Sequence, residues 1–366
     1  MTLFLTCDRV CDGAGKHPAV DLHPLFEADF PRWDRNGDGV LDLKELNALV
    51  ENPQVRGTEA AAVVVIRRRL VPKESEDETP TLTRAQVMAL ADEAVVQREV
   101  ARIRHHLPTI NRALFLPGDP NLLTFHQGGL GDCYLMSVLG AFTYRDPQAV
   151  RAMINPLPSG AYEVHFASRR TLTIPPVTDA ELVMGAPEGS DHGIWMAVME
   201  KAYAEIRREV KEEKSGEDIE GDDAVTHDLI GHGGSSGPVI AQFTGHKSST
   251  AHLEHWIKEG PDKAADRAND LLTRLTAERR LITVWTTHDH SKLPVPHSHV
   301  FGVLGYDPAG RMVRVFNPWG NHRTPNGPPG LENGYVTRNG IFEVPLKEFV
   351  QIFNGITYET DSPLKN

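Results

Sequence analysis

The most informative stretch of the sequence is Gln127-Gly128-Gly129-Leu130-Gly131-Asp132-Cys133-Tyr134-Leu135-Met136, a glycine-rich loop that runs directly into apolar residues extending to Phe142. This pattern predicts that Cys133 begins a buried helix. The first N–H groups of a helix have no partner within it and the helix dipole is positive there, so we expect the Cys133 sulfur to favour the thiolate. A thiolate is a nucleophile, and the amide of Gln127 is a candidate donor to the carbonyl oxygen under attack. The alternative is a structural cysteine buried in an apolar helix.

A cysteine nucleophile needs a histidine as base and a polar group that orients the histidine. His299 stands at the start of a predicted strand over 299–306, and a turn leads from it into a second predicted strand over 312–316. The second strand ends in Asn317-Pro318-Trp319-Gly320. A hairpin of this kind brings Asn317 near His299, so both residues are candidate partners of Cys133.

The histidines around this strand also admit a second interpretation, a metal site. Four of them lie close together in the sequence, and alternate strand residues share one face; they are His288, His290, His297 and His299. The sequence has no His-Glu-x-x-His helix, which disfavours a zinc hydrolase. His297 is the one rival to His299 as the catalytic base, and the apolar strand directly after His299 favours the latter.

The N-terminal third contains a calcium-binding pattern, Asp34-Arg35-Asn36-Gly37-Asp38-Gly39-Val40-Leu41-Asp42-Leu43-Lys44-Glu45. It matches the EF-hand loop, in which oxygen ligands recur at fixed positions and a glycine allows the sharp turn. The predicted ligands are the side chains of Asp34, Asn36 and Asp38, the carbonyl of Val40, Asp42 through a water molecule, and both carboxylate oxygens of Glu45. Apolar residues at helical spacing on both sides predict flanking helices. We therefore expect one Ca²⁺ ion in this loop.

EF-hands usually occur in pairs, and a second copy of the pattern follows. Residues Thr81–Leu90 resemble Val40–Leu49 position by position, which places the start of the second loop at Ser75. This second loop lacks the required acid, glycine and glutamate, and has in their places Thr79, Pro80 and Gln86. We therefore expect residues 20–100 to form an EF-hand pair in which only the first loop binds calcium.

Composition excludes several classes of function. The formal net charge of −12 argues against nucleic acid as the main partner, because phosphate binding requires clustered Lys and Arg. No apolar run approaches the roughly 20 residues that span a bilayer, and the N-terminal residues lack the features of a signal peptide. Three cysteines (Cys7, Cys11 and Cys133) cannot form a disulfide framework. We therefore expect a cytoplasmic protein without a membrane span, in which a metal site or a pair formed by Cys7 and Cys11 is a minor alternative.

Taken together, these motifs resemble the calpain-type cysteine proteases, whose catalytic core is papain-like. The matching blocks follow the order of the family over roughly residues 115–360, and they are Gln127–Phe142, Gly193–Ala204, His299–Gly305, Asn317–Gly320 and Gly340–Phe349. The resemblance implies that Cys133 is the nucleophile, that His299 acts as general base and acid, and that Asn317 orients the histidine. It also implies that Gln127 contributes to the oxyanion hole and that Trp319 shields the histidine–asparagine contact from water.

The sequence also departs from this family. Calpain catalytic cores bind calcium through acidic residues near the nucleophile loop and after the Asn-Pro-Trp-Gly motif, whereas this chain has Thr124-Phe125-His126 and Asn321–Asn326 there. We therefore do not expect calcium sites in the core. Tyr134 replaces the tryptophan that usually follows the nucleophile. The EF-hand pattern lies at the amino end, whereas familiar calpains carry such modules at the carboxyl end.

The expected fold is α+β: a papain-like two-lobed cysteine protease, with a helical lobe and a β-rich lobe, preceded by a helical EF-hand pair. The expected domains are 1–105 for the N-terminal segment and the EF-hand pair, 106–235 for the helical lobe with Cys133, and 236–366 for the β-rich lobe with His299 and Asn317. The glycine-rich stretch 231–237 lacks the lysine of a phosphate-binding loop and is expected to be a flexible connector between the lobes.

The expected function is that of an intracellular cysteine endopeptidase, which cleaves polypeptide substrates through a thioester at Cys133. Calcium at the EF-hand would be structural or regulatory. The alternative is a non-catalytic calcium-binding scaffold that keeps a calpain-like fold. The sequence leaves the oligomeric state open.

Overall fold

The computed structural model describes residues 18–70, 81–185, 193–215, 226–287 and 295–364. The chain divides into two compact units, an N-terminal unit of Met1–Ala113 with Pro175–Ile230 and a C-terminal unit of Leu114–Ile174 with Gly231–Asn366. These units do not coincide with the three predicted domains, because residues 175–230 belong with the N-terminal part. The division into three domains is a separate statement and stays a prediction.

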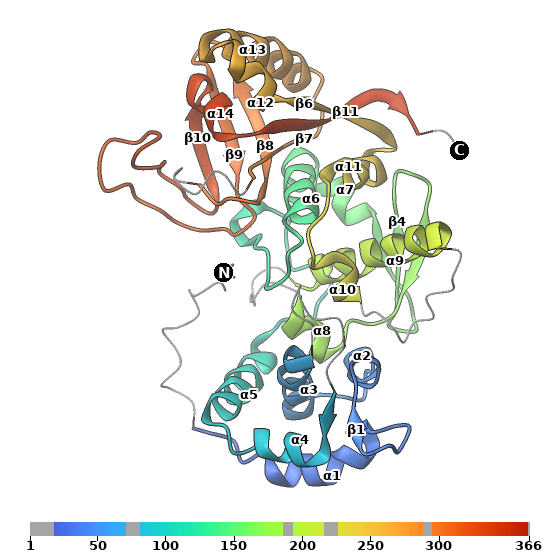
Figure 1. Ribbon diagram of the computed structural model, residues 1–366. Helices are drawn as coiled ribbons and strands as arrows, with labels where there is room; N and C mark the ends of the chain where they lie inside the picture. The colour runs from blue at the N-terminus through green and yellow to red at the C-terminus, as the bar shows by residue number, and fades with distance from the viewer. Residues whose placement is uncertain (1–17, 71–80, 186–192, 216–225, 288–294, 365–366) are drawn as a thin grey trace. The chain divides into compact units, whose positions relative to one another are not determined.

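The described residues of the N-terminal unit are helical apart from one short strand pair (Figure 1). Its elements are α1 (His23–Trp33), β1 (Val40–Leu41), α2 (Leu43–Val50), α3 (Gly57–Leu70), β2 (Leu82–Thr83), α4 (Arg84–Leu90), α5 (Ala94–His106), η2 (Leu107–Thr109), α8 (Asp179–Met184), α9 (Trp195–Ser215) and α10 (Thr226–Ile230). The core forms around α3, whose residues Ala60–Ile66 are all buried, and Phe26 packs edge-on against Trp33 with ring centroids 5.8 Å apart.

The two similar segments of the sequence have similar local structures. Strands β1 and β2 pair antiparallel, with Val40 opposite Thr83. Each strand leads into a helix that begins with a capping box, formed by Asp42 and Glu45 at α2 and by Thr83 and Gln86 at α4. The predicted second loop from Ser75 lies mostly outside the described residues.

The C-terminal unit combines a six-stranded antiparallel sheet, in the order β10-β9-β8-β7-β11-β6, with a three-stranded sheet β3-β4-β5. The strands are β3 (Ile154–Pro156), β4 (Tyr162–His165), β5 (Thr171–Ile174), β6 (His246–His252), β7 (Ile282–Trp285), β8 (Val300–Asp307), β9 (Met312–Phe316), β10 (Ile341–Pro345) and β11 (Gly355–Pro363). The helices are η3 (Leu122–Thr124), α6 (Cys133–Arg145), α7 (Pro147–Ala152), α11 (Ser236–Thr244), α12 (Leu253–Trp256), η4 (Ile257–Glu259), α13 (Pro261–Ala277) and α14 (Leu346–Ile352). The predicted hairpin is present as β8 and β9, and the expected mixture of α and β structure is confirmed.

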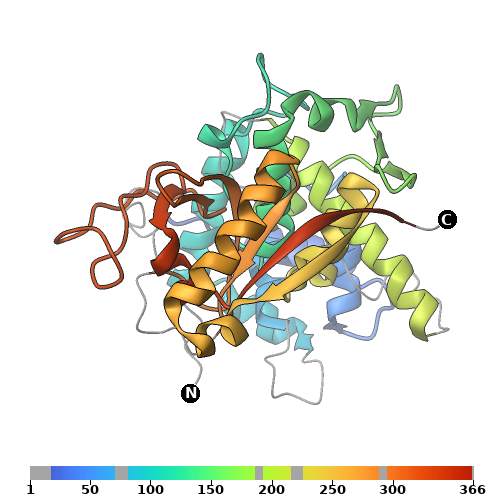
Figure 2. The same ribbon diagram turned by 90° about the horizontal axis from the view of Figure 1, so that it is seen from above.

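Helices cover both faces of the six-stranded sheet (Figures 1 and 2). Helices α13 and α14 cover one face, where Phe301 and Val303 of β8 join the apolar core. Helices α6 and α11 cover the other face, which the intervening residue Gly302 faces. Because successive strand residues alternate between faces, β8 contributes to both layers.

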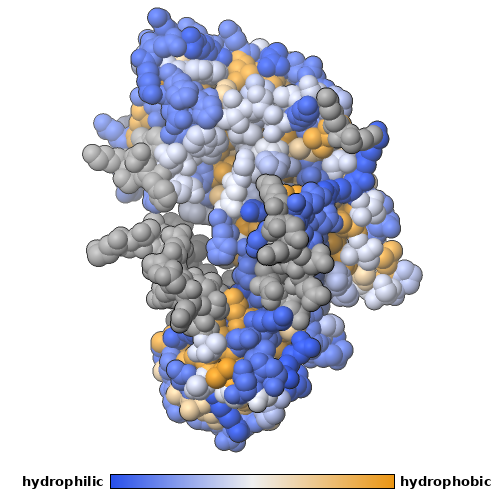
Figure 3. Space-filling model, turned by 45° about the vertical axis from the view of Figure 1, so that its right-hand side comes forward, coloured by the Kyte–Doolittle hydropathy of each residue, from blue (hydrophilic) through white to orange (hydrophobic). Residues whose placement is uncertain are grey.

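Hydrophilic and apolar residues are interspersed on the face of the molecule drawn in Figure 3. Within the described ranges, no helix has both the length and the apolar character that crossing a membrane requires.

Candidate active site

Cys133 is the first residue of α6, and two glycines let this helix lie close to the sheet. A Cβ atom at Gly140 would lie 2.4 Å from Cε1 of Phe316 in β9. A Cβ atom at Gly302 in β8 would lie 2.9 Å from the carbonyl oxygen of Ser137 in α6. Both distances are shorter than real Cβ atoms tolerate, so larger side chains would push α6 away from the strands.

His299 is held rigidly at the point where β8 begins, and only 3% of its surface is exposed. Its backbone N–H donates to Oγ1 of Thr286 at 3.3 Å, and its carbonyl accepts the N–H of Thr286 at 2.9 Å. The ring of Phe301 stands edge-on to the imidazole, with centroids 4.7 Å apart. Ser298, directly before it, has a φ of 48°, a left-handed conformation that is costly outside glycine and persists where the surroundings fix it.

The structure brings His299 and Asn317 together. Their Nε2 and Oδ1 atoms lie 2.9 Å apart, and Asn317 is 2% exposed. A carboxamide oxygen only accepts, so Nε2–H of His299 is the donor, and in the neutral imidazole Nδ1 is then the bare nitrogen. Trp319 covers this pair: its ring centroid lies 4.4 Å from that of the imidazole, and its backbone N–H donates to the same Oδ1 at 3.1 Å.

Gly340 fixes the backbone of Asn317, a contact that sequence reasoning missed. The N–H of Asn317 donates to the carbonyl of Gly340 at 2.8 Å. Gly340 has a φ of 75°, and a Cβ atom there would lie 2.2 Å from the carbonyl oxygen of Asn317. Only glycine therefore fits at this position, and the Gly340 in the sequence was the available signal.

The surroundings of Cys133 differ from the sequence expectation. Burial raises the pKa of its thiol to about 11; a hydrogen bond from the backbone of Val300 opposes this, and the nearby charge of Asp132 adds to it. Burial also lowers the pKa of His299 to about 4, against the hydrogen bond with Asn317. The resting pair is therefore a neutral thiol and a neutral imidazole. Loss of solvation thus opposes the thiolate that the start of a helix favours, and the thiolate stays a prediction.

Cys133 and His299 nevertheless belong to adjoining elements. The backbone of Val300, the residue after His299, contacts the sulfur of Cys133, and the hydroxyl of Ser137 donates to the Val300 carbonyl at 2.7 Å. The start of α6 is thus attached to the start of β8, where the histidine stands.

Gln127 lies beside these residues but uses its amide within its own loop. Its backbone N–H donates to the carbonyl of Pro318 at 2.7 Å, which joins the loop to the Asn-Pro-Trp-Gly motif. Its Nε2 donates to the carbonyl of Leu130 at 2.6 Å, and its Oε1 is buried without a hydrogen-bond partner among the described residues. A role in the oxyanion hole, through the second N–H of the amide, stays a prediction.

The glycine-rich stretch 231–237 is bonded to the nucleophile loop, whereas a flexible connector was expected. Gly131 donates to the carbonyl of Gly231 at 3.1 Å and accepts from Gly233 at 3.0 Å. A Cβ atom at Gly131 would lie 2.3 Å from the Gly231 carbonyl oxygen. The signal in the sequence was glycine on both partners, which permits this close backbone approach.

The metal interpretation of the histidines gains no support from the described residues. His288 and His290 lie outside them, as do Cys7 and Cys11. Within the parts of the chain that are described, no group of three or more His, Cys, Asp or Glu side chains is arranged to hold a metal ion.

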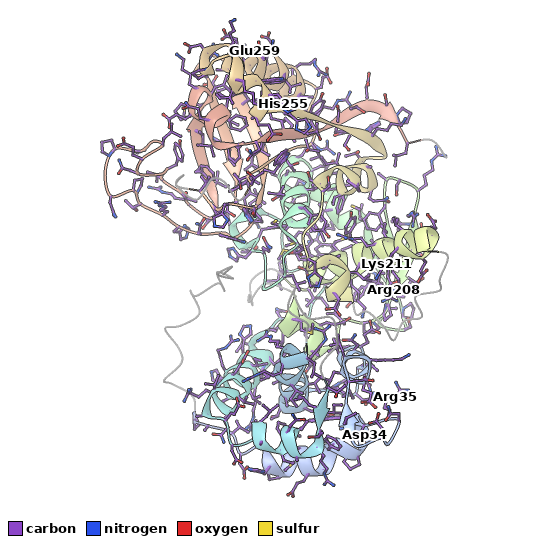
Figure 4. The ribbon with its side chains drawn as sticks, in the orientation of Figure 1. Asp34, Arg35, Arg208, Lys211, His255 and Glu259 are labelled. Carbon is purple, nitrogen blue, oxygen red and sulfur yellow. The ribbon has the colours of Figure 1, made fainter. Side chains whose placement is uncertain are left out.

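The loop after α1, where Asp34 and Arg35 lie (Figure 4), is closed by hydrogen bonds to its own backbone. Asp34 accepts from Gly37 at 2.8 Å and from Gly39 at 3.0 Å, and Glu45 accepts from Arg35 at 2.8 Å. Burial raises the pKa of Glu45. The carboxylates thus point into the loop but do not share one centre.

A comparison with protein families identifies a match to this chain. The family described as calpain family cysteine protease matches residues 84–328, about two thirds of the chain. The matched range contains Cys133, His299 and Asn317, and ends before the similar block at Gly340–Phe349. No curated protein matches the sequence.

Proposed function

The chain belongs to the calpain family of cysteine proteases, and from this premise we propose that it is an endopeptidase in which Cys133 attacks peptide bonds. His299 serves as base and acid, and Asn317 orients its ring. The proposed compartment is the cytoplasm, supported by a cysteine content too low for a disulfide framework. We also propose the three-part organisation with boundaries near residues 105 and 235.

The observation that carries the proposal is the buried 2.9 Å contact between His299 and Asn317. It leaves Nδ1 of the neutral imidazole as a proton acceptor, as a general base requires. The only described cysteine, Cys133, heads the helix attached to the residue after this histidine. The absence of Cys133, His299 or Asn317 would instead favour the non-catalytic scaffold.

The proposed reaction has two stages. The thiol proton of Cys133 moves to Nδ1 of His299 as the sulfur attacks the peptide carbonyl, and the oxyanion is held by the backbone N–H of Cys133 and the amide of Gln127. The imidazolium then protonates the leaving amine, which leaves a thioester at Cys133. A water molecule, deprotonated by His299, hydrolyses the thioester and restores the thiol. Gln127→Ala should slow turnover by roughly a hundredfold or more, since one oxyanion donor is worth about 3 kcal/mol.

Labelling with an epoxysuccinyl inhibitor, together with cleavage of an unfolded protein substrate, tests the proposal. We expect one label per chain, at Cys133, and no label or cleavage in Cys133→Ala. The control is Cys133→Ser, which keeps the size of the side chain. Label at Cys7 or Cys11, or cleavage by Cys133→Ala, would refute the assignment. A folded wild type that neither labels nor cleaves, with calcium present or absent, would establish the scaffold alternative.

We further propose that the loop from Asp34 to Glu45 binds one Ca²⁺ ion. The donor set fits this hard cation, because the side chains of Asp34, Asn36, Asp38, Asp42 and Glu45 and the carbonyl of Val40 offer only oxygen. Gly37 and Gly39 have φ of 74° and 86°, which lets the loop turn sharply.

Calorimetric titration with Ca²⁺ tests this site, with Glu45→Gln as the loss-of-ligand variant and Glu27→Gln, an exposed acid of α1, as the matched control. We expect one site in the wild type and in Glu27→Gln, and at least tenfold weaker binding in Glu45→Gln. Absence of a binding heat in the wild type would refute it. Peptide cleavage that is unchanged in Glu45→Gln would leave calcium a structural role only.

A further inference from the structure

A cavity of about 180 Å³ opens in the C-terminal unit at the end of α6 opposite to Cys133. The helix rises 1.5 Å per residue, so this end lies about 18 Å from the nucleophile. The cavity lies between α6, the end of α13 and strands β7 and β8, and is separate from the proposed catalytic residues. Apolar residues form one wall: Ala141, Leu281, Ile282, Val303 and Leu304.

The polar wall carries three arginines: Arg145, Arg279 and Arg280. Arg145 and Arg279 are fixed side by side by reciprocal bonds, because Nη1 of Arg145 donates to the carbonyl of Arg279 and Nη2 of Arg279 donates to the carbonyl of Arg145, each at 3.0 Å. Arg145 also pairs with Glu359 at 2.8 Å, and Arg280 with Glu278 at 3.0 Å. Arg279 has no carboxylate partner among the described residues, so the wall keeps a net positive charge.

Two further features of this wall bear on ligand binding. Oγ1 of Thr276 lines the cavity, is buried, and has no hydrogen-bond partner in the described part of the chain. A buried unpaired hydroxyl is costly. Arg279 has a φ of 55°, a conformation in which glycine or asparagine is the cheaper residue at the end of a helix.

We propose that this cavity binds a small anion that carries a phosphate group. Guanidinium groups bind phosphate oxygens through paired N–H donors, and the Thr276 hydroxyl supplies another donor. The volume equals that of about six water molecules, which accommodates a phosphate and a short carbon chain against the apolar wall. The anion site is independent of the protease assignment. The same chemistry occurs in a soluble phosphomonoester and in a lipid headgroup.

Calorimetric titration of the full chain with inorganic phosphate, at constant ionic strength set with chloride, tests the site. We expect saturable binding of one phosphate per chain. Arg279→Gln should weaken binding about tenfold or more, and Thr276→Val about threefold or more. The matched control is Arg311→Gln, because Arg311 also has a positive φ, of 51°, but does not line the cavity. We expect its affinity to stay within twofold of the wild type.

The source of the phosphate is distinguished by two further titrations, with glycerol 3-phosphate and with vesicles containing phosphatidic acid. Tighter binding of the first than of inorganic phosphate identifies a soluble ester, and co-sedimentation with the vesicles identifies a lipid. Circular dichroism and urea unfolding verify that each variant folds. The proposal is overturned if the wild type shows no saturable binding, or if folded Arg279→Gln and Thr276→Val both bind like Arg311→Gln.

Discussion

Replacing Asn317 with alanine removes the acceptor that orients His299. Oδ1 of Asn317 accepts from Nε2 of His299 at 2.9 Å and from the N–H of Trp319 at 3.1 Å, in a side chain that is 2% exposed. The N–H of His299 would lose its partner where little water reaches it, whereas Trp319 is 46% exposed. A buried unpaired donor costs about 1–3 kcal/mol, so we expect the free energy of unfolding to fall by about 1–3 kcal/mol.

The same change should slow catalysis. The bond to Asn317 keeps the proton of the neutral imidazole on Nε2 and keeps Nδ1 free to accept the thiol proton. Loss of a preference of about 1–3 kcal/mol corresponds to a decrease of about 5- to 150-fold in kcat/KM. Because Asn317 is buried behind Trp319, we expect the decrease in kcat, with KM nearly unchanged.

Peptide cleavage and urea unfolding measure the two effects, and Asn326→Ala, at an exposed loop residue, is the control. A folded Asn317→Ala that keeps more than half of kcat/KM would refute the positioning role. If Asn317→Ala does not fold, Asn317→Asp provides the test, because it keeps an acceptor and places a negative charge beside the ring. That charge raises the pKa of His299, so the acid limb of the pH–rate profile should move to higher pH; an unmoved limb would contradict the contact.

Three more predictions follow from the site. The pKa of His299 is lowered from 6.5 to about 4, so between these pH values the unfolded state binds more protons than the folded state. The free energy of unfolding should therefore decrease by up to about 3 kcal/mol as pH falls through this range. Urea unfolding at pH 4.5 and 7.5 measures this difference, which should mostly disappear in His299→Gln; a difference that stays the same in the variant would contradict the burial. Because the thiol of Cys133 has a pKa of about 11, its alkylation by iodoacetamide should accelerate steadily above pH 8, whereas a flat profile from pH 5 to 9 would indicate a preformed ion pair. Gly140→Ala should destabilise the protein by about 1–3 kcal/mol through overpacking against Phe316. Adding Phe316→Leu to this variant should restore part of the lost stability. If the two changes in the free energy of unfolding simply add in the double variant, this explanation is wrong.

The hairpin and its histidine–asparagine contact could be predicted because they depend on local rules. Alternating apolar residues indicated two strands, a turn lay between them, and the second strand ended at Asn317. An antiparallel pair joined by a short turn has a fixed register, which places the residue before the first strand near the residue after the second. Gly302 pairs with Phe316 in the structure, and this register places Asn317, which follows the second strand, near His299, which precedes the first.

The protonation of Cys133 could not be predicted in the same way. The helix start is visible in the sequence, and it favours the thiolate. Desolvation depends on what packs around the sulfur, and the packing of α6 on β8 involves Gly140, two turns along the same helix, and Gly302, which is far from Cys133 in the sequence. The pairing of Gly131 with Gly231 was missed for a similar reason, since two glycine-rich segments give no periodic pattern that identifies them as partners.

The neutral resting pair also constrains the chemistry. The pKa values of about 11 for Cys133 and about 4 for His299 differ by about 7, so moving the proton between the separate groups costs about 10 kcal/mol. A contact ion pair recovers only about 4 kcal/mol of this at the effective dielectric of a protein site. The remaining energy cost is too large for the thiolate to be populated before substrate binds. It falls within an ordinary catalytic barrier if the negative charge passes directly from the sulfur to the carbonyl oxygen. The site must therefore stabilise the oxyanion more than the thiolate, and the donors that we propose for this are the second N–H of the Gln127 amide and the first N–H of α6.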